Sequence, residues 1–164
     1  MKYKCYIGID PGLTGAIVAI MDNEIVVTDT TTISTKVGKK NKTLYDVQGM
    51  VAALKEFTDS KYDVRVALEK VHSMKGQGVA STFSTGEGFG LWKGIITAMG
   101  FSMQLVTPQA WKKVMMDGTT GKDKDADRLR AIELFPEAYD KLQRKKDHGR
   151  ADALLIAEYL RRTA

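Results

Sequence analysis

The stretch VRVALEKVH, residues 64–72, contains the pattern on which the fold assignment rests. Residues 64–68 are mostly apolar or β-branched, as in a strand buried within a sheet, and Glu69 follows them directly. A carboxylate at the end of a buried strand costs free energy unless a cation or a hydrogen-bond donor meets it. The stretch therefore predicts a strand that presents Glu69 to a binding partner.

Hydrophobic periodicity on either side of this stretch predicts an α/β order of elements. Residues 3–9, 14–20 and 24–33 are expected to form an antiparallel meander, and the stretch SMQLVTP a fifth strand after the one ending at Glu69. Helices are predicted near 47–54, 86–99, 108–115, 123–134 and 148–162. This order indicates one domain, residues 1–164, with a mixed five-stranded sheet of three antiparallel and then parallel strands, flanked by helices.

Composition is that of a globular protein, with 43% hydrophobic and 27% charged residues among 164. The start MKYKCYIGID enters a strand pattern directly, and no apolar run approaches the roughly 20 residues of a membrane span. Cys5 is the only cysteine, which excludes an internal disulfide. We therefore expect a cytoplasmic protein without a membrane partner.

Positive charge is concentrated in two places. The formal net charge is +5, and residues 141–164 alone contain seven basic and three acidic residues. A second cluster lies in the polar stretch STKVGKKNKT, with Lys36, Lys39, Lys40 and Lys42. Either cluster by itself is typical of a solvated surface segment, so charge favours a nucleic-acid partner only weakly.

Three carboxylates are expected to meet at one edge of the sheet. Asp10 ends the first strand and Glu69 the fourth, and a right-handed crossover permits these strands to be neighbours. Asp152 lies in RADALLIAEYL, within the apolar face of the last helix. Hard divalent cations would neutralise such a cluster, and two of them suit phosphodiester cleavage. Taken singly, the three residues are also compatible with a turn residue, an ion-paired glutamate and a solvent-facing aspartate.

Motifs along nearly the whole chain resemble one known family. IGIDPGLTGA, ALEKVH and KKDHGRADALLIA, in this order, are similar to the RuvC group of Holliday junction resolvases, which have the RNase H-like fold. With GEGFGLWKGI and PQAWKK, the sequence resembles plant plastid and phage-borne resolvases more than the standard bacterial enzyme. A bacterial or phage-infected host cytoplasm is the location that we expect.

The resemblance implies a crossover junction endodeoxyribonuclease that cuts four-way branched DNA by paired symmetric nicks. Asp10, Glu69 and Asp152 match the family's metal-binding carboxylates and are expected to hold two Mg²⁺ ions, which Mn²⁺ should replace. The products would carry a 5′-phosphate and a 3′-hydroxyl. A less selective branched-DNA debranching nuclease is the nearest alternative.

The fourth active-site residue is where sequence and family pattern differ. Bacterial relatives have an acidic residue or a histidine three positions before the last aspartate, and Gly149 occupies that position here. In a helix, His148 would lie about 40° from Asp152 around the axis and Asp147 about 140° away. We predict His148 as the catalytic and metal-binding residue, and Asp147 as the helix N-cap that bonds to the backbone of Gly149 or Arg150. Asp147 is the alternative ligand if the helix begins later.

The helix near 86–99 is expected to pair two subunits. Gly86, Gly90 and Gly94 recur at a spacing of four and form one stripe, with Phe89, Trp92 and Ile96 around it. Such a stripe predicts the close approach of another backbone, and in the resolvase family this helix forms a homodimer. Packing against the chain's own sheet is the alternative.

Contacts with branched DNA are expected from basic residues around the carboxylates, and a loop side chain is expected to wedge into the junction. The phosphate-binding candidates are Lys75, Lys112, Lys113, Arg144, Lys145, Lys146 and Arg150. The wedge candidates are His72, which replaces a phenylalanine of bacterial relatives, Met74 and Phe83, of which Phe83 is more typical of a core residue.

Other functional classes fit fewer features. Asp10, Gly12 and Thr14 match the D-x-G-x-T phosphate loop of actin- and sugar-kinase-like ATPases, but those enzymes need two such domains. A dinucleotide-binding motif at Gly86, Gly88 and Gly90 fails because no strand leads into it and Leu91 breaks the pattern. A catalytically inactive junction-binding protein is disfavoured by the intact carboxylates.

Overall fold

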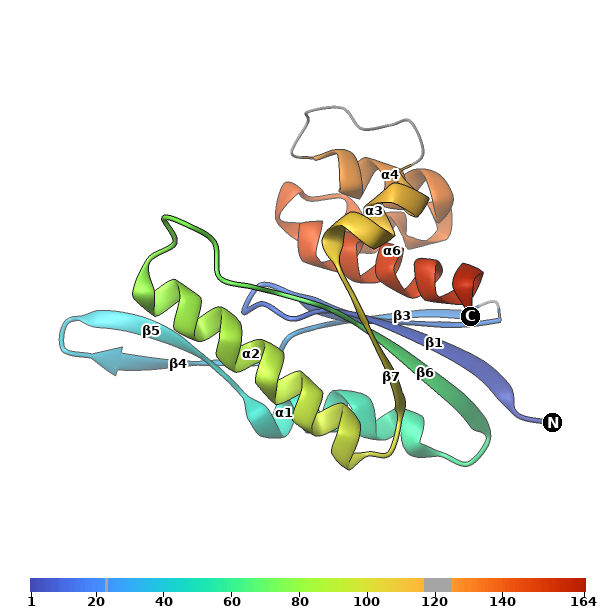
Figure 1. Ribbon diagram of the computed structural model, residues 1–164, viewed down its shortest axis with the longest axis horizontal. Helices are drawn as coiled ribbons and strands as arrows, with labels where there is room; N and C mark the ends of the chain where they lie inside the picture. Colours follow the sequence, from blue (N-terminus) through green and yellow to red (C-terminus); the bar gives the residue numbers. More distant parts are fainter. Residues whose placement is uncertain (23, 117–124) are drawn as a thin grey trace.

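A computed structural model describes residues 1–22, 24–116 and 125–164 and contains a five-stranded sheet of order β3-β2-β1-β6-β7 (Figure 1). β1 pairs antiparallel with β2, which pairs antiparallel with β3, whereas β1–β6 and β6–β7 are parallel. The predicted mixed sheet is confirmed. Its strands are β1 (Tyr3–Asp10), β2 (Ala16–Met21), β3 (Glu24–Asp29), β6 (Tyr62–Glu69) and β7 (Ser102–Val106).

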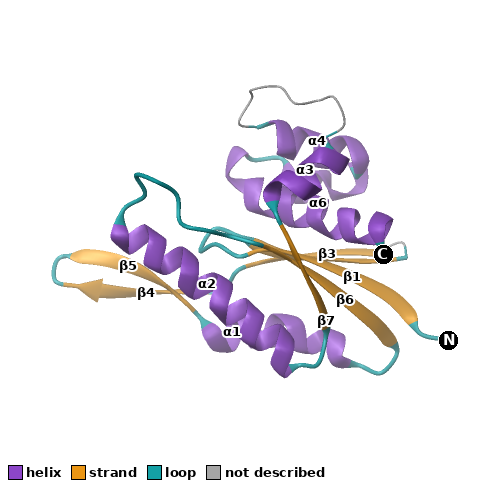
Figure 2. Ribbon diagram, viewed as in Figure 1, coloured by secondary structure: helices purple, strands orange, loops and turns teal. Residues whose placement is uncertain are grey.

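Helices cover both faces of this sheet (Figure 2). One face carries α1 (Val47–Lys55) and α2 (Val79–Ala98), and the other carries α3 (Pro108–Met115), α4 (Ala126–Leu134), α5 (Tyr139–Leu142) and α6 (His148–Thr163). Short 3₁₀ turns span Glu56–Thr58, Pro136–Ala138 and Lys145–Asp147. Among the described residues, no helix is both long enough and apolar enough to cross a membrane.

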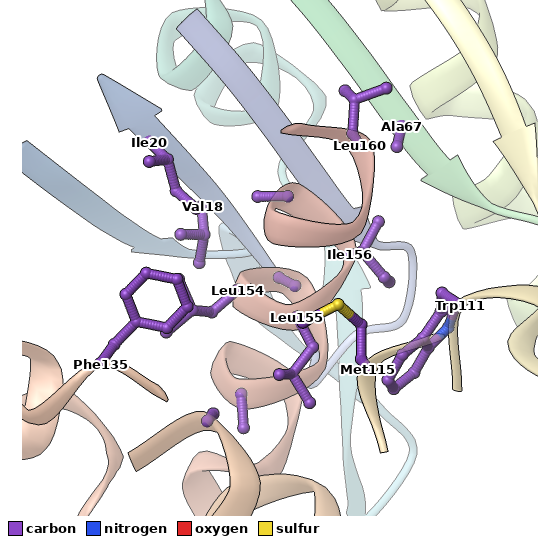
Figure 3. Close-up of a cluster of buried hydrophobic side chains, with 14 of the residues drawn as sticks. Val18, Ile20, Ala67, Trp111, Met115, Phe135, Leu154, Leu155, Ile156 and Leu160 are labelled. Atoms are coloured by element: carbon purple, nitrogen blue, oxygen red, sulfur yellow. The ribbon is translucent and has the colours of Figure 1, made fainter. Parts of the chain in front are cut away.

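The alternation of side chains along the strands divides the core in two. Ile7 and Ile9 of β1 belong to the cluster under α1 and α2. Ala67 of β6 and Val18 of β2 belong to the cluster under α6. Figure 3 shows this second cluster, in which residues of α6 such as Leu154 meet the sheet, α3 and Phe135. Both faces of the sheet are therefore buried, as an α/β fold requires.

The largest differences between predicted and observed boundaries occur at three elements. The strand predicted at 24–33 ends at Asp29, and a separate hairpin of β4 (Thr32–Val37) and β5 (Lys40–Tyr45) follows. Its polar, lysine-rich strands bury little apolar surface, so hydrophobic periodicity did not reveal them. The helix predicted from 86 begins at Val79. For the helix predicted at 123–134, residues 123 and 124 lie outside the described residues, and α4 begins at Ala126.

Helix α6 lies directly on β1 at Gly8. A Cβ atom at this position would lie 2.2 Å from the carbonyl oxygen of Ala153 and 2.4 Å from the nitrogen of Ala157. Both neighbours are helix backbone, which cannot rotate away as a side chain can. The distance between α6 and the sheet therefore depends on the absence of a side chain at Gly8.

We expect Gly8→Ala to lower the free energy of unfolding by about 1–3 kcal/mol, because the added methyl group must push α6 away from β1. Urea denaturation monitored by circular dichroism measures this change. Gly12→Ala is the matched control, since a Cβ atom there has its nearest neighbour at an ordinary 3.8 Å. Equal stability of the Gly8 variant and the control would contradict the close contact.

Candidate active site

Asp10 and Glu69 lie side by side at one end of the sheet. They are the last residues of the parallel strands β1 and β6, whose register pairs Ile9 with Leu68 directly before them. Because side chains alternate along a strand, Asp10 shares the face of Gly8, and Glu69 shares that of Ala67. Ala67 belongs to the core under α6, so both carboxylates point to the α6 side of the sheet.

The N-terminal part of α6 brings Asp152 to the same place. A Cβ atom at Gly149 would lie 2.3 Å from the carbonyl oxygen of Thr14 and 3.3 Å from the Oδ2 atom of Asp10. The first turn of α6 therefore rests on the loop that follows β1, and Asp152 projects from the next turn. Its Oδ1 atom is buried and accepts no hydrogen bond from any described residue. An unpartnered buried carboxylate oxygen is costly and indicates a missing cation or donor.

Burial and neighbouring charges raise the pKa values of the three carboxylates. Burial raises the pKa of Asp152 to about 9, and the charges of Asp10 and Asp127 add to this increase. Burial also raises the pKa of Asp10 to about 7, assisted by the charge of Glu69. For Glu69 the pKa is raised by burial, against the opposing effects of Trp111 and Lys112. The site therefore holds more potential negative charge than its own surroundings neutralise.

Sequence reasoning missed two contributors to this site, Trp111 and Asp127, and assigned a third, Lys112, only to phosphate binding. The Nε1 atom of Trp111 donates a hydrogen bond of 2.7 Å to Oε2 of Glu69, and Trp111 is fully buried. The ammonium group of Lys112, predicted as a phosphate contact beside the carboxylates, donates a hydrogen bond of 2.7 Å to Asp127, and its charge opposes the rise in the pKa values of Asp10, Glu69 and Asp152. The motif PQAWKK contains Trp111 and Lys112 and could have drawn attention to them. Which residues these two side chains contact is decided by the packing of α3 beside β6.

The cluster is not a complete metal cage with its side chains as they stand. Among residues 1–22, 24–116 and 125–164, no three His, Cys, Asp or Glu side chains converge closely enough to hold an ion. The donor set nevertheless suits a hard divalent cation, since it consists of partly buried carboxylates with raised pKa values and includes one buried, unpartnered oxygen.

The structure separates the two candidates for the fourth residue. Helix α6 begins at His148, so this exposed side chain lies on the side of the helix that Asp152 occupies. Asp147 is only 3% exposed, and its carboxylate accepts hydrogen bonds from the backbone and the guanidinium of Arg144. Burial opposes its ionisation, but these bonds outweigh burial and hold its pKa below the ordinary value. The predicted cap of α6 by the Asp147 side chain is wrong, because that carboxylate closes the preceding 3₁₀ turn instead.

Three of the predicted phosphate-binding cations already have partners, and one of them is Lys112, which is bonded to Asp127. Arg150 donates two hydrogen bonds of 2.7 Å to Asp29, and Arg144 donates to Asp147. Together with Lys146 and Thr14 they line a cavity of 330 Å³ beside the N-terminus of α6. The remaining candidates, Lys75, Lys113 and Lys145, are exposed.

Helix α2 presents its glycine stripe to solvent. Cβ atoms at Gly86, Gly90 and Gly94 would meet nothing within 4 Å, so the alternative of packing against the chain's own sheet is wrong. Trp92 and Ile96 do not surround the stripe as predicted, since both are fully buried on the opposite side of the helix.

The wedge candidates all lie on the surface. Phe83, expected in the core, is 74% exposed because it lies in the first turns of α2, beyond the edge of the sheet. Met74 is 68% exposed, and His72 is exposed as well. All three side chains are therefore accessible enough to remain candidates for the residue that wedges into a DNA junction.

Comparisons with known proteins support the resemblance found in the sequence. No family model matches the chain. Over 87 residues it is 38% identical to a chloroplastic Holliday junction resolvase of Chlamydomonas reinhardtii, a match that covers 52% of this chain and 10% of that longer protein. The structure is similar to Thermus thermophilus RuvC in complex with a Holliday junction substrate, with a TM-score of 0.60 and 14% identity over 100% of this chain and 97% of the other. A second Thermus thermophilus RuvC structure is similar with a TM-score of 0.55 and 17% identity, over 98% of this chain and 96% of the other. The RNase H-like fold of RuvC is thereby confirmed.

We expect the stability of the metal-free protein to decrease as pH rises. The folded-state pKa values of Asp10, about 7, and Asp152, about 9, exceed the ordinary value of 3.8. Their contribution to stability is therefore complete below pH 4 and is lost as pH rises through 7 to 9. Thermal melts in EDTA from pH 5 to 9 measure this loss, and added Mg²⁺ should raise the melting temperature at pH 8.

Asp152→Asn should raise the melting temperature in EDTA at pH 8 and reduce the Mg²⁺ effect, because it removes a buried charge. Asp140→Asn, at an exposed position, is the control that should change neither quantity. Melting curves of the wild type that are independent of both pH and Mg²⁺ would contradict the predicted charge cluster.

Proposed function

We propose that the protein is a metal-dependent endodeoxyribonuclease that resolves four-way DNA junctions by paired nicks. The observation that carries this proposal is the convergence of Asp10, Glu69 and Asp152 on one side of a RuvC-like sheet, with Oδ1 of Asp152 buried and unpartnered. The sequence match to a Holliday junction resolvase supports the choice of substrate. Nucleases of this kind need a cation beside buried carboxylates, and this site provides the carboxylates.

Asp10, Glu69 and Asp152 would hold two Mg²⁺ ions, with Mn²⁺ as a substitute and His148 as a further ligand or water-orienting group. When bound, the ions supply Lewis acidity for phosphodiester hydrolysis. Hydrolysis forms a bond between water oxygen and phosphorus and breaks the bond to the 3′ oxygen, leaving a 3′-hydroxyl and a 5′-phosphate.

Residues around the carboxylates position them and bring positive charge. The buried indole of Trp111 holds one oxygen of Glu69, so the orientation of that carboxylate is set by the packing of α3. Lys112 places its ammonium group beside the carboxylates, where it is also available to a phosphate oxygen if it leaves Asp127. His148 must be neutral to bind a cation or to accept a proton from water.

A homodimer would hold two such sites for paired cutting. The exposed stripe of Gly86, Gly90 and Gly94 on α2 supports this arrangement, because a partner helix can approach its backbone without displacing any side chain. Each exposed glycine costs the helix about 1 kcal/mol relative to alanine, a cost that a dimer interface would explain.

Asp10→Asn and Glu69→Gln should abolish cleavage of a synthetic four-way junction in Mg²⁺ while binding is retained or strengthened, because each change removes negative charge near phosphates. Nicks are mapped at nucleotide resolution on junction, forked and linear duplex DNA. Asp140→Asn is the control and should cut like the wild type. Symmetric nicks on the junction alone are expected, whereas equal cutting of forks would favour a general debranching nuclease. Cleavage by either variant near the wild-type rate would refute the metal-ligand assignment.

His148→Ala should reduce the nicking rate by about two orders of magnitude or more, the scale of a lost catalytic acid–base group, and leave stability nearly unchanged. Asp147→Ala should instead lower the free energy of unfolding by about 1–3 kcal/mol, because it removes a buried acceptor of charged hydrogen bonds. Single-turnover nicking and urea denaturation of both variants separate these outcomes. If Asp147→Ala is the inactive and stable variant, the roles of the two residues are reversed.

A further inference from the structure

The two tryptophans of the chain are both fully buried, but their indole N–H groups have different surroundings. Nε1 of Trp111 donates a hydrogen bond of 2.7 Å to Oε2 of Glu69. Nε1 of Trp92 has no hydrogen-bond partner among the described residues. The bond of Trp111 satisfies a buried donor, and it also acts on a carboxylate that is a candidate cation ligand.

The chain brings Trp111 to Glu69 by a short and rigid path. Val106, the last residue of β7, pairs with Glu69 in the parallel register of the sheet. Thr107 follows and caps α3, where its hydroxyl accepts a hydrogen bond from the helix backbone. The indole of Trp111 then packs in the core cluster under α6, beside Met115 (Figure 3). Strand pairing, the helix cap and core packing therefore fix the indole without help from a cation.

The ring of Trp111 is also held on its face. The ammonium group of Lys112 lies 5.1 Å from the ring centroid and donates at 2.7 Å to Asp127. An indole N–H group is a donor only, so it has no lone pair with which to bind a cation. Trp111 therefore affects a bound cation through the orientation of Glu69.

The bond makes the two oxygens of Glu69 unequal. Oε2 is engaged by Trp111, whereas none of the described residues donates a hydrogen bond to Oε1. Mg²⁺ demands a compact, nearly octahedral set of ligands and keeps several waters, whereas the larger Ca²⁺ accepts more ligands and often binds both oxygens of one carboxylate. A carboxylate with one oxygen engaged offers the single ligand atom that suits Mg²⁺ and disfavours the two-oxygen binding open to Ca²⁺.

We propose that Trp111 is a positioning residue that holds Glu69 for binding through one oxygen and so favours Mg²⁺ over Ca²⁺ in the active site. This inference rests on the proposed function, that the three carboxylates hold Mg²⁺. Hydrogen-bond partners of metal-binding side chains typically contribute about 10- to 100-fold to metal affinity. Without the bond, Glu69 is free to turn and to offer both oxygens. Its loss should therefore weaken Mg²⁺ binding by that factor and leave Ca²⁺ binding nearly unchanged.

The test compares variants that lose the indole N–H group of Trp111 with a variant that loses that of Trp92. Trp111→Phe removes the donor. Replacement of Trp111 by β-(3-benzothienyl)alanine, which has sulfur in place of the N–H group, removes the donor and keeps the shape of the ring. Trp92→Phe is the matched control, since Trp92 is equally buried and its N–H group has no partner among the described residues.

The rise in melting temperature at pH 8 is measured against the concentration of Mg²⁺ or Ca²⁺, without DNA and relative to each variant in EDTA. In both Trp111 variants the half-saturating concentration of Mg²⁺ should increase about 10- to 100-fold, and that of Ca²⁺ less than about threefold. Trp92→Phe should change neither concentration. In the nicking assay, Ca²⁺ should inhibit Mg²⁺-dependent cleavage by Trp111→Phe at lower concentrations than it inhibits the wild type.

An unchanged Mg²⁺ requirement in both Trp111 variants would overturn the proposal. Equal changes for Mg²⁺ and Ca²⁺, or an equal Mg²⁺ change in Trp92→Phe, would overturn it as well, because they would reflect general damage to the site or to the core. If the wild type responds to neither cation, the proposed metal site fails and the inference fails with it. The expected changes without nicking of the junction by the wild type would refute the nuclease and retain Trp111 as the residue that positions Glu69.

Discussion

The close approach of helix α6 to strand β1 is the contact on which the rest of the structure depends. Gly8 leaves room for the helix backbone where any side chain would collide with Ala153 and Ala157. At the other end of this contact, Gly149 lets the first turn of α6 rest on the loop after Asp10. Two glycines, one on each element, thus determine how deep α6 lies. That depth carries Asp152 into the space above the sheet where Asp10 and Glu69 already point.

The same contact creates an electrostatic cost. Burial is the leading cause of the raised pKa of all three carboxylates, and their mutual repulsion increases it for Asp10 and Asp152. Trp111 and Lys112 compensate only in part, through one hydrogen bond to Glu69 and one nearby positive charge. An apolar residue in place of Asp152 would pack without this electrostatic cost. Such a cost is therefore typical of a functional site. We interpret the cluster as a site whose negative charge is balanced by ligands rather than by the protein alone.

Charge elsewhere on the molecule is arranged in the opposite sense. The acidic cluster lies at the carboxyl ends of β1 and β6, while the separate hairpin of β4 and β5 contains four lysines and no acidic residue. Arg144 and Arg150, near α6, form ion pairs with Asp147 and Asp29, so these two cations already have a structural role.

Much of this was available in the sequence, because strands and helices with one buried face carry a strong periodic signal. The mixed sheet of three antiparallel and then parallel strands, the ends of the strands at Asp10 and Glu69, and the start of the last helix near residue 148 were predicted from that signal and confirmed. The hairpin of β4 and β5 was not, because all of β4 and the first four residues of β5 are exposed, and exposed strands carry no strong hydrophobic signal. Phe83 was assigned to the core for the related reason that an aromatic residue does not report where its helix extends beyond the sheet.

Only the tertiary structure decided which polar groups meet. The bond between Trp111 and Glu69 joins residues 42 positions apart, and that between Arg150 and Asp29 joins residues 121 apart. No local pattern specifies such partners, because they depend on the packing of whole elements. Asp147 illustrates the difference: the sequence determined that it precedes the last helix, and only the fold showed that its carboxylate turns back to Arg144. Local periodicity thus determined the elements and their order, whereas the close packing of α6 and α3 on the sheet decided the environment of each charge.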